Sequence, residues 1–212
     1  MGNSVSIDLI YALRKNGLKA NIISLQTSHK CYNFGTPLKE EFAKECGWRK
    51  KKNLENVNWP NVDAIYLHDH WPKSDLNNLK SVLKEIRTLS MAPVYVFGPK
   101  MVFKSLIPDI VHACKSSLPL AINNYAQNFS ELENRSQINN SLIDFFQNEN
   151  YITDNVFYIN LLSIQGNEEN RFEIISSKTS EFLYFDKSHL TDHGALELGE
   201  KIKSKHPHLL NL

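Results

Sequence analysis

Short apolar runs alternate with amphipathic stretches along this chain. Four runs have the length and composition of buried β-strands, and they cover residues 20–25, 62–67, 93–97 and 156–162. Apolar residues recur at helical spacing around them, over residues 7–16, 38–48, 74–90 and, after a capping Thr191, 192–202. Strands separated by helices predict an α/β fold, a three-layer α/β/α arrangement in which helices cover both faces of a parallel sheet.

Two stretches depart from this alternation. Residues 26–37 are polar and contain Gly35 and Pro37, which predicts a loop. The stretch from about 100 to 150 has a weaker pattern, in which we expect a helix over 141–146. We interpret it as a variable insert in a single domain that spans residues 1–212.

The charge balance offers no reason to expect nucleic acid as a partner. The 212 residues carry 24 Lys and Arg against 23 Asp and Glu, a formal net charge of +1. The basic cluster at 49–52 stands alone, which favours a solvated helix face over a nucleic-acid patch. No apolar run approaches the roughly 20 residues that span a bilayer, and the first residues lack the order of a secretory signal.

The chain contains three cysteines, Cys31, Cys46 and Cys114. Their odd number and irregular spacing match neither a disulfide framework nor a zinc-binding pattern. The default expectation is therefore three buried or free thiols, while the sequence leaves open whether one pair forms a disulfide.

The richest chemistry lies near the C-terminus. Asp186 and His189 are three residues apart, after an apolar run and before the last helix. A carboxylate so close to an imidazole can orient the ring, which then acts as a general base toward a hydroxyl. The alternative is a turn of solvated polar residues.

These residues resemble a family pattern. Asp-x-x-His-Leu-Thr-x-x-Gly-Ala, from Asp186 to Ala195, resembles the last block of SGNH/GDSL esterases, and residues 2–8 (Gly-Asn-Ser-Val-Ser-Ile-Asp) resemble the first. The resemblance implies a flavodoxin-like α/β/α fold and a catalytic triad of Ser4, His189 and Asp186, with an acyl-serine intermediate. Two other interpretations of Ser4 are an N-cap of the helix over 7–16 and part of an N-myristoylation pattern that nothing else supports.

The middle of the chain resembles one subgroup, the SGNH domains that are fused to, or work with, membrane acyltransferase-3 proteins. An apolar strand is followed by Trp71, a helix and a strand that ends at Gly98-Pro99, as in that subgroup. The resemblance implies an esterase or O-acyltransferase that acts on O-acyl groups, acetyl above all, of a carbohydrate. It also implies a periplasmic or membrane-associated bacterial domain, an acyltransferase-3 protein as partner and no cofactor.

Several positions differ from the family pattern. Asn3 replaces the usual Asp, Val5 stands where the subgroup often has His, and the strand that precedes the serine in the family is missing before Gly2. The third block is absent in its usual form. We assign the oxyanion hole to the backbone N–H of Ser4, a backbone N–H at Gly35 and the His70 ring.

These departures motivate rival hypotheses. One is a non-catalytic carbohydrate-binding or accessory SGNH-like domain. Another is a nucleotide-binding module, for which the chain has no Gly-rich phosphate loop. The run His68-Asp69-His70 also raises a metal site, but adjacent residues of a strand point to opposite faces, so we assign no metal.

Overall fold

A computed structural model describes residues 4–25, 30–31, 37, 39–69, 71, 76–148, 155–167 and 171–211, without the side chains of residues 4, 5, 76 and 77. The chain forms two compact units, each built from three segments. The first unit comprises Met1–Ser6, Ala20–Gly98 and Asn140–Ile159, and the second comprises Ile7–Lys19, Pro99–Asn139 and Asn160–Leu212. None of the helices in the described ranges is both long and apolar enough to cross a bilayer.

The first unit contains a parallel sheet. Its strands β1 (Ile65–His68), β2 (Val94–Phe97) and β3 (Val156–Ile159) pair in the order β1-β2-β3. All four residues of β2 are buried, as an apolar central strand requires. The prediction of an α/β fold with a parallel sheet is therefore confirmed. The last predicted strand is shorter than its apolar run over 156–162, because the chain leaves the sheet after Ile159 and turns into a helix.

Two helices of the first unit pack side by side. They are α2 (Ala43–Glu55), which follows the short η2 (Glu40–Phe42), and α3 (Leu76–Leu89), while η3 (Trp59–Asn61) leads into β1. Lys50 of α2 and Glu85 of α3 form an ion pair of 2.7 Å. The basic cluster at 49–52 lies on α2, where Arg49 pairs with Glu45, so the structure agrees with a solvated helix face.

The strand predicted over residues 20–25 is wrong. The structure describes these residues as irregular, and they join no ladder among the described residues. Ile23 is 60% exposed, so this apolar run does not supply the two-sided burial of a parallel strand. A strand is stable only with a neighbour that takes its backbone hydrogen bonds, and a pattern of apolar residues cannot guarantee one.

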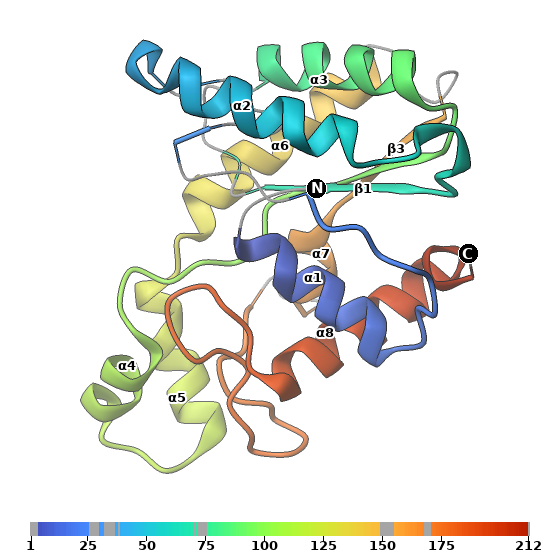
Figure 1. Cartoon of the computed structure of the whole chain (residues 1–212). Helices are drawn as coiled ribbons and strands as arrows, with labels where there is room; N and C mark the ends of the chain where they lie inside the picture. Colours follow the sequence, from blue (N-terminus) through green and yellow to red (C-terminus); the bar gives the residue numbers. More distant parts are fainter. Residues whose placement is uncertain are drawn as a thin grey trace. The chain divides into compact units, whose positions relative to one another are not determined.

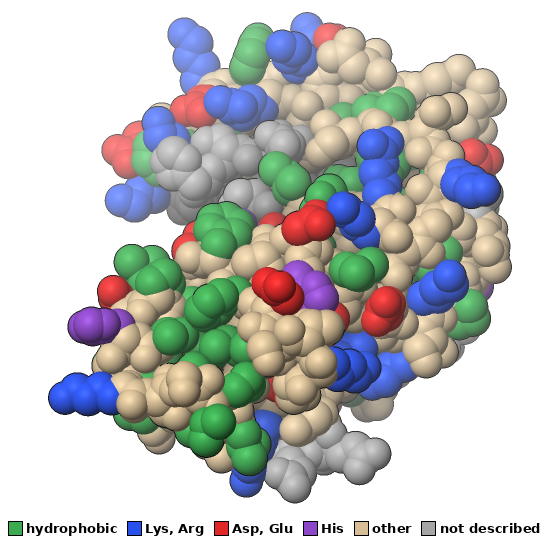
Figure 2. Space-filling model, turned by 90° about the horizontal axis from the view of Figure 1, so that it is seen from below, with side chains coloured by type: hydrophobic (Ala, Val, Ile, Leu, Met, Phe, Trp, Pro, Cys, Tyr) green, Lys and Arg blue, Asp and Glu red, His purple; other side chains and the backbone are tan. Residues whose placement is uncertain are grey.

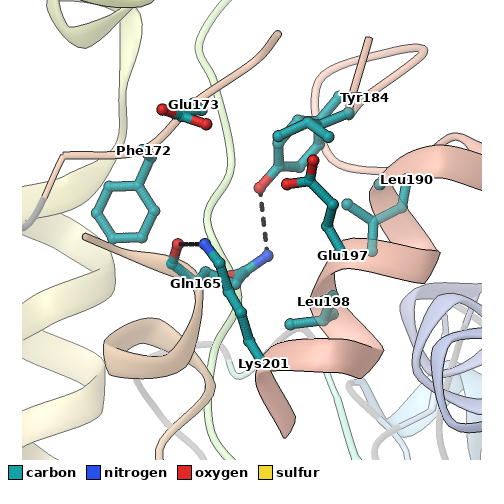
Figure 3. A pocket seen from close by; sticks show the side chains of 10 residues that line it. Gln165, Phe172, Glu173, Tyr184, Leu190, Glu197, Leu198 and Lys201 are labelled. Carbon is teal, nitrogen blue, oxygen red and sulfur yellow. Dashed lines mark hydrogen bonds between the residues drawn. The ribbon is translucent and has the colours of Figure 1, made fainter. Parts of the chain in front are cut away.

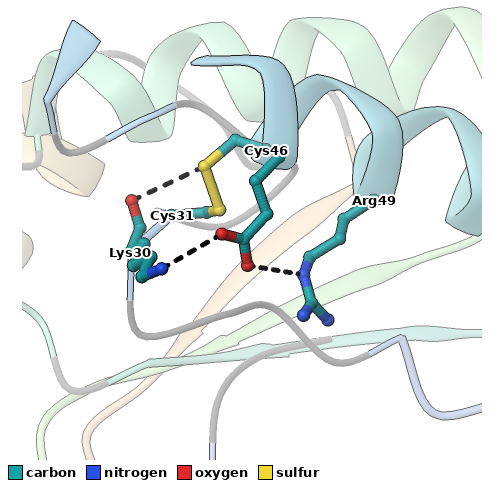
Figure 4. Close-up of a disulfide and its surroundings, with 5 residues drawn as sticks. Lys30, Cys31, Cys46 and Arg49 are labelled. Carbon is teal, nitrogen blue, oxygen red and sulfur yellow. Dashed lines mark hydrogen bonds and ion pairs between the residues drawn. A yellow bond between two sulfur atoms is a disulfide. The ribbon is translucent and has the colours of Figure 1, made fainter. Parts of the chain in front are cut away.

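Cys31 and Cys46 form a disulfide in the first unit (Figure 4). The default expectation of three separate thiols is therefore wrong for this pair, while Cys114 remains a free thiol. The bond ties residue 31 to the first turn of α2, fifteen residues further along the chain. Lys30 and Arg49 both contact Glu45 beside it, at 3.3 and 3.2 Å.

The second unit is helical. It holds most of α1 (Ser4–Lys15), α4 (Ile107–Cys114), α5 (Pro119–Ala126), η4 (Gln127–Phe129), the start of α6 (Leu132–Asn148), α7 (Leu161–Gln165), α8 (Asp192–Lys205) and η6 (Pro207–Leu210). α1 and α8 lie side by side in Figure 1, and the Asn16 amide donates to the Leu196 carbonyl at 3.1 Å. α1 ends at Lys15, and Gly17, two residues later, has a φ of 113° that suits the stop that the sequence predicts.

The stretch from 100 to 150 holds more structure than its pattern predicts. Instead of a single helix over 141–146, it contains α4, α5 and the long α6. Prolines stand in the first turns of α4 and α5, where a missing backbone N–H costs nothing. α4 and α5 have only eight residues each, too few for a clear helical periodicity in the sequence.

Candidate active site

Asp186 and His189 stand in a tight turn of the second unit. Tyr184 and Leu190 form an antiparallel bridge that closes the turn, and the Phe185 N–H donates to the His189 carbonyl at 3.1 Å. Asp186 Oδ1 accepts the backbone N–H groups of Ser188 and His189, both at 2.7 Å. An aspartate that bonds the backbone two and three residues ahead builds its own turn, so the local sequence explains this geometry.

The other carboxylate oxygen of Asp186 contacts the imidazole. Oδ2 lies 2.7 Å from His189 Nδ1. Burial raises the pKa of Asp186, but the hydrogen bonds from the N–H groups of His189 and Ser188 and from the His189 ring outweigh it and hold this pKa below its ordinary value. The carboxylate is therefore ionised at neutral pH and accepts, which places the proton of the ring on Nδ1 and leaves Nε2 as the basic nitrogen.

The pair is accessible from solvent. The side chains of His189 and Asp186 are 28% and 31% exposed. The ring of Phe185 stacks on the imidazole, with centroids 5.7 Å apart and planes at 18°, while Phe185 itself is 58% exposed. Further exposed apolar side chains of this unit are Leu106 before α4, Leu118 before α5, Leu120 in α5, and Phe182. Figure 2 shows hydrophobic groups gathered on one face of the molecule.

The helix after the turn holds it in place. Thr191 caps α8 by accepting the Gly194 N–H at 3.0 Å, as the sequence predicts. Gly194 packs so close to the chain before the turn that a Cβ there would lie 2.0 Å from the Leu183 carbonyl oxygen. His193 follows the cap, and its Nε2 lies 2.8 Å from Thr179 Oγ1. It therefore contacts a hydroxyl on another loop, whereas His189 contacts the Asp186 carboxylate.

The candidate nucleophile stands at the start of α1. Ser4 is the first residue of this helix, so the chain enters the helix earlier than the pattern over 7–16 predicts, and its side chain is outside the described part. The hydroxyl of Ser6, two residues later, donates to the His68 carbonyl at 2.7 Å. The first turn of α1 therefore meets the carboxyl end of β1 within the first unit, the edge at which α/β sheets bind ligands.

The remaining predicted site residues have no described geometry. Gly35 and His70, assigned to the oxyanion hole, lie outside the described residues. His68 is buried at 1% exposure on β1. Among the residues that the structure describes, no three His, Cys, Asp or Glu side chains are grouped as metal ligands would be.

A small cavity lies behind the turn, between α7 and α8 (Figure 3). Gln165, Tyr184, Glu197 and Lys201 are among its lining residues, and Gln165 Nε2 lies 3.2 Å from the Tyr184 hydroxyl. Its space of about 30 Å³ suits roughly one water molecule. It is therefore too small to hold a sugar or an ester, and the surface at His189 remains the candidate site.

Two features of the site could not be predicted from the sequence. Nothing in the local pattern distinguishes Phe185 from the apolar run before it, although its ring covers His189. Lys100 reads as a surface residue, but it is 1% exposed and contacts Asp8. The one sign of this contact in the sequence is Asp8, the last residue of the block over residues 2–8 that resembles the first block of the SGNH/GDSL esterases.

Comparisons with known proteins bear on the family and the fold of the chain. Residues 1–204 match a family model described as "SGNH domain (fused to AT3 domains)". The solved periplasmic domain of a lipopolysaccharide acetyltransferase from Salmonella ser. Paratyphi A has a similar fold, with a TM-score of 0.72 and 17% sequence identity over 96% of this chain and 80% of that one. No curated protein sequence matches the chain.

Proposed function

The chain belongs to the SGNH domains of the kind fused to AT3 domains, and from this premise we propose that it is a serine esterase or O-acyltransferase that acts on O-acyl groups of a carbohydrate. Ser4 is the nucleophile, His189 the general base and Asp186 the residue that orients the base. The acyl group, acetyl in the simplest case, passes through an ester with Ser4.

The contact between Asp186 and His189 carries this proposal. Their 2.7 Å hydrogen bond fixes the ring through Nδ1, which directs the basic Nε2 away from the carboxylate. A serine hydroxyl is a weak nucleophile at neutral pH and needs such an adjacent base. The exposure of both side chains, close to a third, leaves the base accessible to a hydroxyl and a substrate.

Helix α1 supports the choice of Ser4. Positions four apart lie on the same face of a helix, so position 4 shares a face with Asp8. Asp8 Oδ2 accepts the backbone N–H of Leu190, the residue after His189, at 3.3 Å. The same helix thus begins at the candidate nucleophile and contacts the turn of the candidate base one helical turn later.

The chemical steps follow from these roles. As the Ser4 hydroxyl oxygen attacks the acyl carbonyl, its proton moves to Nε2 of His189. The imidazolium then protonates the departing alcohol oxygen, and the acyl group remains on Ser4. In the second half, His189 takes a proton from the accepting hydroxyl, that oxygen attacks the acyl-serine carbonyl, and Ser4 recovers its proton.

The acceptor decides between the two activities. Water as acceptor gives hydrolysis, while a sugar hydroxyl gives transfer to the carbohydrate. Because the family comprises domains fused to AT3 domains, we include an AT3 membrane protein as the partner that supplies the acyl group. The oxyanion of each tetrahedral intermediate is assigned to the N–H of Ser4, a backbone N–H at Gly35 and the His70 ring, and losing one such donor raises the barrier by about 2.7–4 kcal/mol.

Turnover of p-nitrophenyl acetate tests the proposal. Ser4→Ala and His189→Ala should each lower kcat by roughly 10³-fold or more. Ser117→Ala and His112→Ala, at exposed positions of the loop after α4 and of α4 itself, are the matched controls and should retain wild-type turnover. Equal turnover in all five proteins would refute the assignment.

A serine-directed covalent probe separates the proposal from an accessory role. Mass spectrometry should find the probe on Ser4 of wild type and not of His189→Ala. Binding of an acylated oligosaccharide without labelling of Ser4 would instead favour a non-catalytic carbohydrate-binding domain.

A further inference from the structure

A buried ion pair lies beside the candidate active site. The ammonium of Lys100 contacts Asp8 Oδ2, and the two side chains are 2% and 12% exposed. No step of the proposed reaction uses either group. A charge this deeply buried carries a large desolvation cost, which is offset only by a well-placed partner.

The same carboxylate oxygen connects the pair to the turn. Asp8 Oδ2 accepts both from Lys100 and from the backbone N–H of Leu190, at 3.3 Å for the latter. The peptide that donates this N–H joins His189 to Leu190. Asp8 therefore holds the main chain on one side of the imidazole, while Asp186 holds the ring itself.

Lys100 also belongs to a segment that follows the turn closely. Three residues further on, the Phe103 N–H donates to the Lys187 carbonyl at 2.9 Å, and the Phe103 ring meets Tyr184 edge-on with centroids 5.3 Å apart. The carbonyl of Lys100 accepts from the Arg135 side chain of α6 at 3.0 Å. Hydrogen bonds therefore hold the backbone of this segment at residues 100 and 103, and this fixes the position of Lys100.

Burial is the largest influence on Lys100 and holds its pKa below the ordinary value of a lysine. The Asp8 carboxylate, and to a smaller extent Asp186, act in the opposite direction and favour the charged form. Arg135, which lowers the pKa of Lys100, has its own pKa lowered to about 10 by burial. The two carboxylates that favour the charged lysine are the two that contact the turn of His189.

We propose that Asp8 and Lys100 are positioning residues of this site: their ion pair fixes the peptide after His189 and thereby the angle at which the imidazole meets Asp186. The inference rests on the proposed function for its catalytic consequence, while the effect on the turn stands on the contacts alone. It predicts that loss of the pair lowers kcat and leaves KM nearly unchanged, because neither residue contacts substrate.

The decisive variant removes both charges together. Lys100→Met alone would leave an uncompensated buried carboxylate, which is strongly destabilising. Asp8→Leu/Lys100→Met removes both charges of the ion pair and the acceptor for the Leu190 N–H. We expect it to fold, with the wild-type circular dichroism spectrum, and to lose kcat toward p-nitrophenyl acetate by about 10- to 100-fold. Lys104→Met, at an exposed lysine of the same segment, is the control and should match wild type.

Proton NMR provides a readout that does not need activity. The Nδ1–H of His189, assigned by its disappearance in His189→Ala, should give a downfield resonance in wild type and in Lys104→Met. In the double variant it should broaden or exchange faster, because the turn is no longer held. A folded double variant with wild-type kcat and an unchanged resonance would overturn the proposal. If Ser4→Ala proved fully active, the proposed function would fail, and the NMR comparison would still decide the role of the pair in the turn.

Discussion

Nδ1 of His189 lies 2.7 Å from Oδ2 of Asp186, in a turn whose backbone the same aspartate organises through its other oxygen. One side chain thus performs two tasks, because it shapes the turn and orients the base. This dual use explains how an Asp and a His only three residues apart can be held in a fixed relation. It also allows the two tasks to be separated by substitution.

Asp186→Asn should separate them in an activity assay. The amide oxygen of an asparagine can still accept the N–H groups of Ser188 and His189, so the turn should persist. The charge that favours the Nδ1–H tautomer and the imidazolium is lost, and we expect kcat to fall by roughly 10⁴-fold. Asp109→Asn, on the exposed first turn of α4, is the control. Turnover of Asp186→Asn within a factor of three of wild type would contradict this role.

The same carboxylate should make stability depend on pH in the acid range. The pKa of Asp186 is lower in the folded protein than the value of about 3.9 expected in the unfolded chain. Its stabilising contribution is therefore complete above that value and is lost as the pH falls through the folded pKa. Urea unfolding from pH 6 down to pH 3 should show the difference between wild type and Asp186→Asn shrinking only below about pH 4. A constant difference over that range would contradict the lowered pKa.

The ring of Phe185 should affect the base more than the fold. An aromatic contact such as that between Phe185 and His189 contributes about 0.5–1.5 kcal/mol, so Phe185→Ala should lower kcat by roughly 2- to 10-fold. Because the side chain is 58% exposed, the melting temperature should change little. Phe182→Ala, at an apolar side chain that is 44% exposed, should leave kcat unchanged. Equal effects of the two substitutions would assign both rings to general surface packing.

Gly194 and Gly47 both lie in helices, and we expect their substitution by alanine to change the stability of the protein in opposite directions. A methyl group at 194 would lie 2.0 Å from the Leu183 carbonyl oxygen, while one at 47 has no atom within 4 Å. Gly194→Ala should destabilise the protein by about 1–3 kcal/mol through overpacking. Gly47→Ala, in α2, should stabilise it by up to about 1 kcal/mol. Thermal unfolding of both variants measures the contrast, and a neutral Gly194→Ala would show that the turn can move away from α8.

The Cys31–Cys46 disulfide should contribute measurably to stability. Closing a loop of this length restricts the unfolded chain, and its loss should cost about 2–4 kcal/mol. Cys31→Ser/Cys46→Ser should therefore melt at a lower temperature than Cys114→Ser, which retains the bond. A thiol assay of the unfolded protein should count one free thiol before reduction and three after. Three thiols before reduction would show that the bond does not form.

The sequence predicts those parts of the site that are local. The turn of Asp186 and His189, its Thr191 cap and the start of the following helix are encoded within ten residues, and the structure contains each of them. The sequence predicts β1 and β2 for a similar reason, because a buried strand between turn signals is mainly apolar. Such features depend on contacts between near neighbours in the chain.

The missed features depend on distant contacts. A lysine that is buried against an aspartate 92 residues away has the same local sequence as one on the surface, so Lys100 carried no signal. The run over 20–25 looks like a strand, but only a hydrogen-bonding neighbour would make it one. The odd number of cysteines and their irregular spacing do not predict a disulfide between Cys31 and Cys46. The bond depends on the fold, in which α2 brings residue 46 back to residue 31.

The order of the segments in the two compact units limits how this chain can be divided. Each unit takes one piece from near the start of the chain, one from its middle and one from later on, and the pieces alternate. A single cleavage therefore cannot separate the two units, because wherever the chain is cut at least one fragment still carries segments of both. Insertions that leave the fold intact are expected in surface loops inside one segment, and attempts to exchange a unit between relatives would have to transplant three stretches at once.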